Sequence, residues 1–364
     1  NMEFNQFSHL AAADSDIEIN EGSIIFADSA SLDISLSSAL TINTGNFDLL
    51  NDAKFNAGST SIDIFGGDFR LFDNVALDLD TIDMFVGGNA QFTGLSSFKL
   101  TNSEVDIVNG TFSTAESATA SFFGTSLLVE GDVAFAGDEH YFEDSSIGIT
   151  STVFPGSLGA SVSAKISTVR TPITVDGGNM EFIDSSSLYA EDSALVVNDG
   201  SVIFADDSSL EFELSTSLTV NTGNFDLLDN ARFIAGATSI DIIGGDFRVF
   251  NNVALDLVTI DMFVGGNVQF TEDSQFKLSN SEVDVVGGTF STADNVNLSF
   301  FTTSLLVEGN ATFSGAIHYF EDSSMDIVSG ILEASDNANV TAVATPITVD
   351  GGNMEFNNFA SLLA

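Results

Sequence analysis

The stretch SIDIFGGDFRLFDNVALDLDTIDMFVGGNAQF, residues 61–92, decides the fold. Apolar and polar residues alternate within "SIDI", "ALDL" and "TIDM", and this period of two is typical of β-strands with one buried face. Gly-Gly followed by Asp or Asn interrupts the alternation, as expected where a turn needs positive φ. Such Gly turns recur every 20–23 residues in most of the chain. That spacing is too short for two packed helices and fits one coil of a β-solenoid.

The same pattern repeats on a longer scale. Residues 20–149 align without gaps with residues 198–327, and 90 of the 130 aligned positions are identical. We therefore expect a first long repeat of about eight coils at 1–175, a second at 176–349 and the start of a third at 350–364. The sequence predicts an all-β fold, a right-handed parallel β-helix of about 16 coils in one continuous solenoid. At about 4.8 Å per coil it would be about 80 Å long.

Position within the coil assigns the faces. Phenylalanine recurs two or four residues after the key Gly of a coil, and these two positions share a strand face, so we expect the rings to stack inside. A polar residue nearly always follows that Gly. In register these side chains should form a ladder that satisfies the turn backbone. Its members are Ser23, Asn46, Asp68, Asn89, Thr111, Asp132, Asn179, Asn224, Asp246 and Asn267.

Composition excludes several classes of function. The chain has 53 Asp and Glu against 8 Lys and Arg, a net charge of -45. Nucleic acid is excluded as a partner because contacts to its phosphates need clustered Lys and Arg side chains. With 44% hydrophobic residues the chain has ample material for a core, and with no Cys it has no disulfide or thiolate chemistry. No apolar run approaches about 18 residues, so we expect no membrane insertion.

The best candidate site is a set of outward aspartates, each set between two inward apolar residues. They lie on three successive coils of each long repeat: Asp63, Asp83, Asp106, Asp241, Asp261 and Asp284. Like charges directly opposed on neighbouring strands destabilise a sheet, so something should compensate. Bound Ca²⁺ is one hypothesis, since carboxylate oxygens suit it. A solvated ladder screened by salt is the alternative, and no cofactor is otherwise required.

The few basic and histidine side chains are informative. Six bases form pairs across the long repeat, and we interpret them as structural counterions: Lys54 with Arg232, Arg70 with Arg248 and Lys99 with Lys277. Lys165 and Arg170 have no basic counterpart. His140 and His318 are one position repeated, which we expect at the surface or at an edge.

The "GGN" and "GGD" corners, the Phe positions and the "SIDI" strands resemble right-handed parallel β-helix repeats of large extracellular surface proteins. These include adhesins, autotransporter passengers and other pectin-lyase-like scaffolds. The resemblance implies an extracellular or cell-surface setting. "RTP" at 170–172 is similar to the R-x-P of pectate lyases, but the second copy reads "ATP" at 344–346. We therefore predict no enzymatic activity.

The functional hypothesis is an extracellular structural protein, a stiff acidic β-helical rod that builds a fibre, sheath, stalk or surface layer. The last residues re-enter the phase of the first, which predicts either a window of a longer array or subunits that stack end to end. Partners would then be further copies of the chain, end to end or laterally, and divalent cations drawn by the negative charge. One alternative is an adhesin stalk that presents a distal binding domain. A polysaccharide lyase or hydrolase is the other.

Overall fold

The computed structural model describes residues 1–150, 156–293 and 295–364, and within these ranges the chain is all-β with no helix. Short parallel strands stack into the coils of a β-solenoid, about sixteen in the chain, which confirms the predicted fold class. In the described residues, no helix exists that could cross a membrane. The predicted boundaries of the long repeats and their continuity remain predictions.

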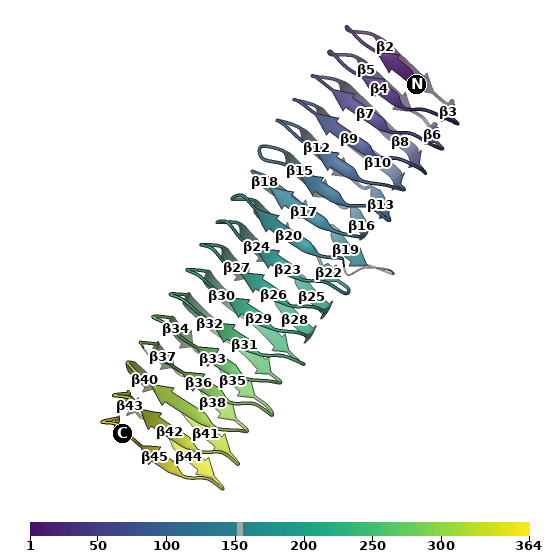
Figure 1. Cartoon of the computed structure of the whole chain (residues 1–364). Coiled ribbons are helices and arrows are strands. Elements are labelled where there is room, and N and C mark those ends of the chain that lie inside the picture. The colour runs from purple at the N-terminus through teal and green to yellow at the C-terminus, as the bar shows by residue number, and fades with distance from the viewer. Residues whose placement is uncertain (151–155, 294) are drawn as a thin grey trace. The chain divides into compact units, whose positions relative to one another are not determined.

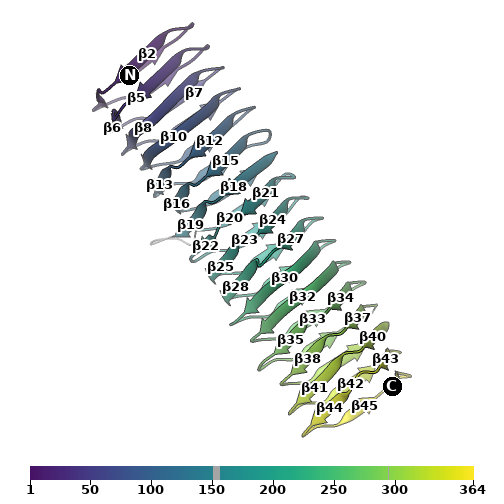
Figure 2. The same cartoon turned by 180° about the vertical axis from the view of Figure 1, so that it is seen from behind.

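The chain forms two compact units, residues 1–178 and 179–364. Figure 1 and Figure 2 show from opposite sides how strands of successive coils lie parallel within each unit. Most coils carry three strands, here termed first, second and third in chain order, with a corner after each.

In the unit of residues 1–178 the first strands are β1 (Met2–Phe4), β4 (Ile24–Phe26), β7 (Phe47–Leu50), β9 (Phe69–Phe72), β11 (Ala90–Phe92), β14 (Phe112–Thr114), β17 (Val133–Ala136) and β20 (Leu158–Ser161). The second strands are β2 (His9–Ala13), β5 (Ser31–Ser35), β12 (Ser97–Thr101), β15 (Thr119–Phe123), β18 (Glu139–Glu143) and β21 (Lys165–Val169). The third strands are β3 (Ile17–Ile19), β6 (Ala39–Ile42), β13 (Glu104–Val108), β16 (Ser126–Glu130), β19 (Ser146–Thr150) and β22 (Ile173–Val175). In β8 (Lys54–Ile64) and β10 (Ala76–Val86) the second and third strands are continuous.

The unit of residues 179–364 repeats this order. Its first strands are β23 (Met180–Phe182), β26 (Val202–Phe204), β29 (Phe225–Leu227), β31 (Phe247–Val249), β33 (Val268–Phe270), β36 (Phe290–Thr292), β39 (Ala311–Ser314), β42 (Leu332–Ser335) and β45 (Met354–Phe356). Its second strands are β24 (Ser187–Glu191), β27 (Ser209–Glu213), β34 (Gln275–Ser279), β37 (Asn297–Phe301), β40 (Ile317–Glu321), β43 (Asn339–Val343) and β46 (Ser361–Leu363). Its third strands are β25 (Ala194–Asp199), β28 (Ser217–Thr222), β35 (Glu282–Val285), β38 (Ser304–Val307), β41 (Ser324–Val328) and β44 (Ile347–Asp350). The continuous pair is β30 (Arg232–Ile242) and β32 (Ala254–Val264).

The core of each unit is a column of stacked side chains, because every second residue of a strand points inward. The Phe residues predicted to lie inside are buried, except in the last coil, where Phe356 is 41% exposed. Their rings meet across coils; Phe182 and Phe204, for example, stack with centroids 4.7 Å apart. Burial of each such ring stabilises the fold by about 1.5–3 kcal/mol. The prediction of an internal Phe column is confirmed.

The polar ladder at the Gly corner is also confirmed. Asn46 Oδ1 accepts a hydrogen bond from the backbone N–H of Asp68 at 3.0 Å, and Asp68 Oδ1 accepts one from that of Asn89 at 2.9 Å. Glycine is required beside this ladder because successive corners touch. A Cβ on Gly67 would lie 2.0 Å from the carbonyl oxygen of Gly45.

A second ladder of hydroxyl groups, which no pattern in the sequence predicted, follows the corner between the second and third strands. The backbone N–H of Ser103 donates to Thr125 Oγ1 at 3.4 Å, and that of Thr125 donates to Ser145 Oγ at 3.1 Å. Each hydroxyl in turn donates to a carbonyl two residues earlier in its own coil, as Thr125 does to Phe123. The polar corners therefore bond neighbouring coils, as the core does.

Candidate functional site

The six predicted aspartates all lie on outward strand faces, between buried apolar neighbours, as expected. Their mutual register differs from the expectation. Asp63 and Asp106 both pair with Phe85, while Asp83 pairs with Ser61 and Glu104. The second copy is the same: Asp241 and Asp284 pair with Phe263, and Asp261 pairs with Ser239 and Glu282.

The prediction that successive aspartates oppose one another directly is therefore wrong. The register between β8 and β10 joins Ile64 to Val86, an offset of 22 residues, whereas Asp63 and Asp83 are 20 residues apart. The motif spacings, 20 residues from Asp63 to Asp83 and 23 from Asp83 to Asp106, do not report the register between coils and so concealed this two-residue displacement. The acidic side chain in register with Asp83 is instead Glu104, which no pattern in the sequence singled out.

The aspartates nevertheless influence one another. Partial burial raises the pKa of Asp63 and of Asp106, and the charge of Asp83 raises both further. In the second copy burial and the charge of Asp261 raise the pKa of Asp241 in the same way. Asp83 thus acts on two carboxyl groups diagonal to it.

Asp83 and Glu104 line a shallow, open groove at the corner where β8 and β10 pass without a break. Ser59 and Thr81 take positive φ there, of 52° and 56°. The second copy has the same groove beside Asp261 and Glu282. Across the described ranges, no three His, Cys, Asp or Glu side chains are grouped to hold a metal ion. Ca²⁺ binding by the six aspartates remains a hypothesis.

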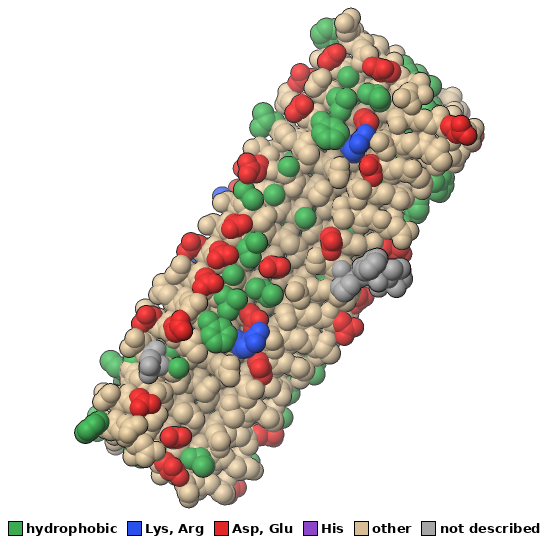
Figure 3. Space-filling model, in the orientation of Figure 1, with side chains coloured by type: hydrophobic (Ala, Val, Ile, Leu, Met, Phe, Trp, Pro, Cys, Tyr) green, Lys and Arg blue, Asp and Glu red, His purple; other side chains and the backbone are tan. Residues whose placement is uncertain are grey.

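Of the six bases predicted as counterions, Arg70, Arg248, Lys99 and Lys277 pair with other aspartates. Arg70 donates from Nε and Nη2 to both oxygens of Asp48, at 2.7 and 2.8 Å, and Arg248 does the same to Asp226 at 2.6 and 2.5 Å. Each pair joins register partners on neighbouring coils, and the two carboxylates are nearly buried. On the face drawn in Figure 3 the acidic side chains are spread widely and bases are few. Counterion roles fit these bases, but the aspartates they neutralise are not the predicted six.

Lys99 and Lys277 form more exposed pairs. Lys99 Nζ lies 3.0 Å from Asp78, and Lys277 Nζ lies 3.0 Å from Asp256. These lysines and aspartates are again register partners on neighbouring coils. The pairs therefore tie adjacent coils together on the outer face.

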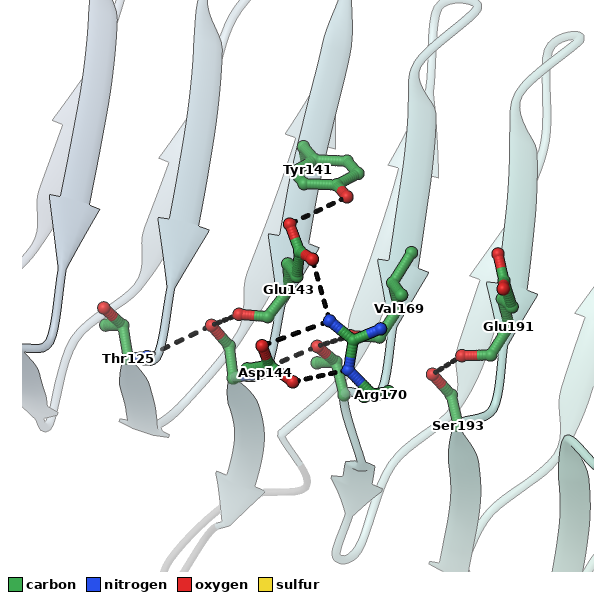
Figure 4. A network of polar contacts seen from close by, with 10 residues as sticks. Thr125, Tyr141, Glu143, Asp144, Val169, Arg170, Glu191 and Ser193 are labelled. Atoms are coloured by element: carbon green, nitrogen blue, oxygen red, sulfur yellow. Dashed lines mark hydrogen bonds and ion pairs between the residues drawn. The ribbon is translucent and has the colours of Figure 1, made fainter.

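Arg170 makes the densest polar contact. Its Nε lies 2.6 Å from Asp144 Oδ1, and its Nη2 lies 2.8 Å from Glu143 Oε1 and 3.1 Å from Asp144 Oδ2 (Figure 4). Tyr141 donates from Oη to Glu143 Oε2 at 3.2 Å, which fixes the other carboxylate oxygen. The guanidinium holds the pKa of Asp144 below its usual value.

The expectation for the histidines is wrong. His140 and His318 are fully buried inside the solenoid, where their rings lie 4.7 Å from Phe135 and 5.1 Å from Phe313. They are the second residues of β18 and β40, and this position points into the core in the second strand of a coil. The alternation of side chains along the strand therefore buries these histidines despite their polarity. Burial lowers the pKa of each to about 4.

One outward cluster joins a hydroxyl, an imidazole and a carboxylate. His9 Nδ1 lies 2.8 Å from Ser31 Oγ, and His9 Nε2 lies 3.6 Å from Asp33 Oδ2. Acyl transfer would also need N–H donors for an oxyanion beside the hydroxyl. The Ser31 N–H instead donates to the carbonyl of Ser8 in the preceding coil. We interpret the cluster as a surface polar contact.

No protein-family model, curated protein or solved structure matches this chain.

Proposed function

We propose that the chain is an extracellular structural protein whose stacked coils build a fibre, sheath, stalk or surface layer. One observation carries the proposal: the same devices join coil to coil throughout both units. They are parallel backbone pairing, the Phe column and the two polar ladders. Repetition of packing favours a mechanical role, since a repeated stack resists bending at every coil.

Self-association is part of this proposal. Parallel strands can continue by pairing with strands of another copy, because an open strand edge offers unpaired N–H and C=O groups. The net charge of -45 opposes lateral contact between copies in low salt. Divalent cations or high ionic strength would screen that repulsion, so we expect assembly and thermal stability to rise with salt and with millimolar Ca²⁺.

Electron microscopy of the full chain, combined with fibre diffraction, tests the proposal. The expected result is filaments or sheets with a meridional repeat of about 4.8 Å. Magnesium at matched ionic strength serves as the control for a Ca²⁺-specific effect. Separate short particles at every concentration and salt condition would overturn the proposal.

A further inference from the structure

Arg170 shows what the corner after a Tyr-x-Glu-Asp segment can bind. The segment is Tyr141–Asp144, at the end of β18, and the Arg170 guanidinium from the next coil bridges its two carboxylates. The Tyr141 hydroxyl donates to Glu143 Oε2, while the guanidinium donates to Glu143 Oε1. The arrangement is a preformed acceptor for a planar, forked cation.

The second copy keeps these acidic groups and lacks the cation. Tyr319 donates to Glu321 Oε2 at 3.1 Å, matching the first copy, and Asp322 follows with φ 49° where Asp144 has 50°. Ala344 stands where Arg170 stands in the first copy, with φ 50° against 48°. Backbone and acceptors are therefore equivalent, and no base of the described residues pairs with Glu321 or Asp322.

We propose that Glu321 and Asp322 bind the guanidinium of an arginine side chain from another polypeptide. The observation that points to this ligand is the first copy, where the same acidic pair is bound by a guanidinium in cis. Asp322 and Ala344 are exposed, so the position is open to solvent. Val343 beside it is 43% exposed and offers an apolar surface for the methylene stem of an arginine.

A third such segment, Tyr189–Asp192, lacks the equivalent geometry. Its tyrosine hydroxyl is shared between Glu191, at 3.0 Å, and Glu213 of the next coil, at 3.1 Å. The next corner has two successive positive-φ residues, Leu214 and Ser215, in place of one. The position from which Arg170 reaches its carboxylates is therefore not reproduced there.

Isothermal titration of the full chain with a short arginine-containing peptide tests the proposal, at about 150 mM salt to screen diffuse attraction. The wild-type chain should bind one peptide. Ala344→Arg should weaken binding about tenfold or more, because the added guanidinium fills the site in cis. Arg170→Ala should create a second site and raise the stoichiometry from one to two.

Two controls separate this site from general attraction to an acidic protein. Ala76→Arg adds the same charge on an exposed residue of β10 and should leave binding unchanged. The same peptide with lysine for arginine should bind more weakly, since an ammonium cannot bridge both carboxylates. Equal binding of the two peptides, equal effects of Ala344→Arg and Ala76→Arg, or displacement of peptide by Ca²⁺ alone at matched ionic strength would overturn the proposal.

Discussion

The two long repeats keep their interior alike and differ on their outer corners. His140 and His318 lie against equivalent Phe rings, and Arg70 and Arg248 form ion pairs with equivalent, nearly buried aspartates. Outside, Arg170 of the first copy is replaced by Ala344. The difference shows that buried contacts between coils are retained in both copies, while the exposed ion pairs of Arg170 are lost in the second copy without a change in the backbone around them.

The core gives the largest test of this comparison. Phe122 stacks on Phe142, whereas its counterpart Phe300 meets Phe320 edge to face, with centroids 5.1 Å apart. Phe122→Ala and Phe300→Ala should each cost about 3–5 kcal/mol, because both leave a cavity in a packed column. Urea unfolding followed by circular dichroism measures the change.

Phe65→Ala is the matched control, since that ring is 52% exposed, and it should cost much less than either core change. A cost at Phe300 far below that at Phe122 would show that the two cores are not equivalent despite their shared sequence.

The buried histidines predict the next largest effect, on acidification. An unfolded imidazole has a pKa near 6.5, whereas burial holds that of His140 and of His318 at about 4. Between pH 6.5 and 4 the unfolded chain binds more protons than the folded chain, so the free energy of unfolding falls as the pH drops. The loss reaches about 3 kcal/mol for each histidine near pH 4. The Ala136 backbone and the charge of Asp138 oppose the shift at His140.

His140→Leu and His318→Leu should each flatten the dependence of unfolding free energy on pH between 6.5 and 4. Phe65→Leu is the control, because that exposed ring does not titrate and its substitution should leave the dependence unchanged. Equal pH slopes for wild type and the double variant would refute the role assigned to burial.

The buried ion pairs predict a smaller effect. Arg70→Ala leaves the Asp48 carboxylate, only 9% exposed, without its charged partner, and should cost about 2 kcal/mol. Arg248→Ala should cost the same through Asp226. Lys99→Ala breaks a pair that is exposed on both sides and should change stability by under about 1 kcal/mol, as measured by urea unfolding.

Most of the fold could be predicted from the sequence because the solenoid repeats one local rule. A period of two places Phe92 inside and Asp63 outside, and Gly corners set the coil length. The same alternation, counted along β18, places His140 inside. The prediction of a surface position was wrong because it followed the polarity of the imidazole instead.

The candidate site was less predictable because it depends on pairing between coils. The two-residue displacement of Asp83 follows from the path of β10 through its corner, which motif spacing does not report. The Arg170 contact likewise joins residues that are more than a coil apart in sequence. Register, which no single strand encodes, decides which charges meet.

The smallest predicted effect concerns the aspartates themselves and sharpens the comparison of the two copies. Asp83→Asn should lower the pKa of Asp63 and of Asp106, but not to the ordinary value, since burial is the larger cause of each shift. Asp261→Asn should act equally on Asp241. The same substitution should lower the pKa of Asp284 less completely, because the charge of Glu308 also raises that pKa.

Carboxyl NMR titration of wild type and both variants measures these shifts. With Ca²⁺ added, bound metal would lower the wild-type pKa values at Asp63 and Asp106 more than Mg²⁺ does at equal ionic strength. Equal effects of the two ions would favour a solvated, screened set of carboxylates over a Ca²⁺ site. Titration curves unchanged by Asp83→Asn would contradict the diagonal coupling between coils.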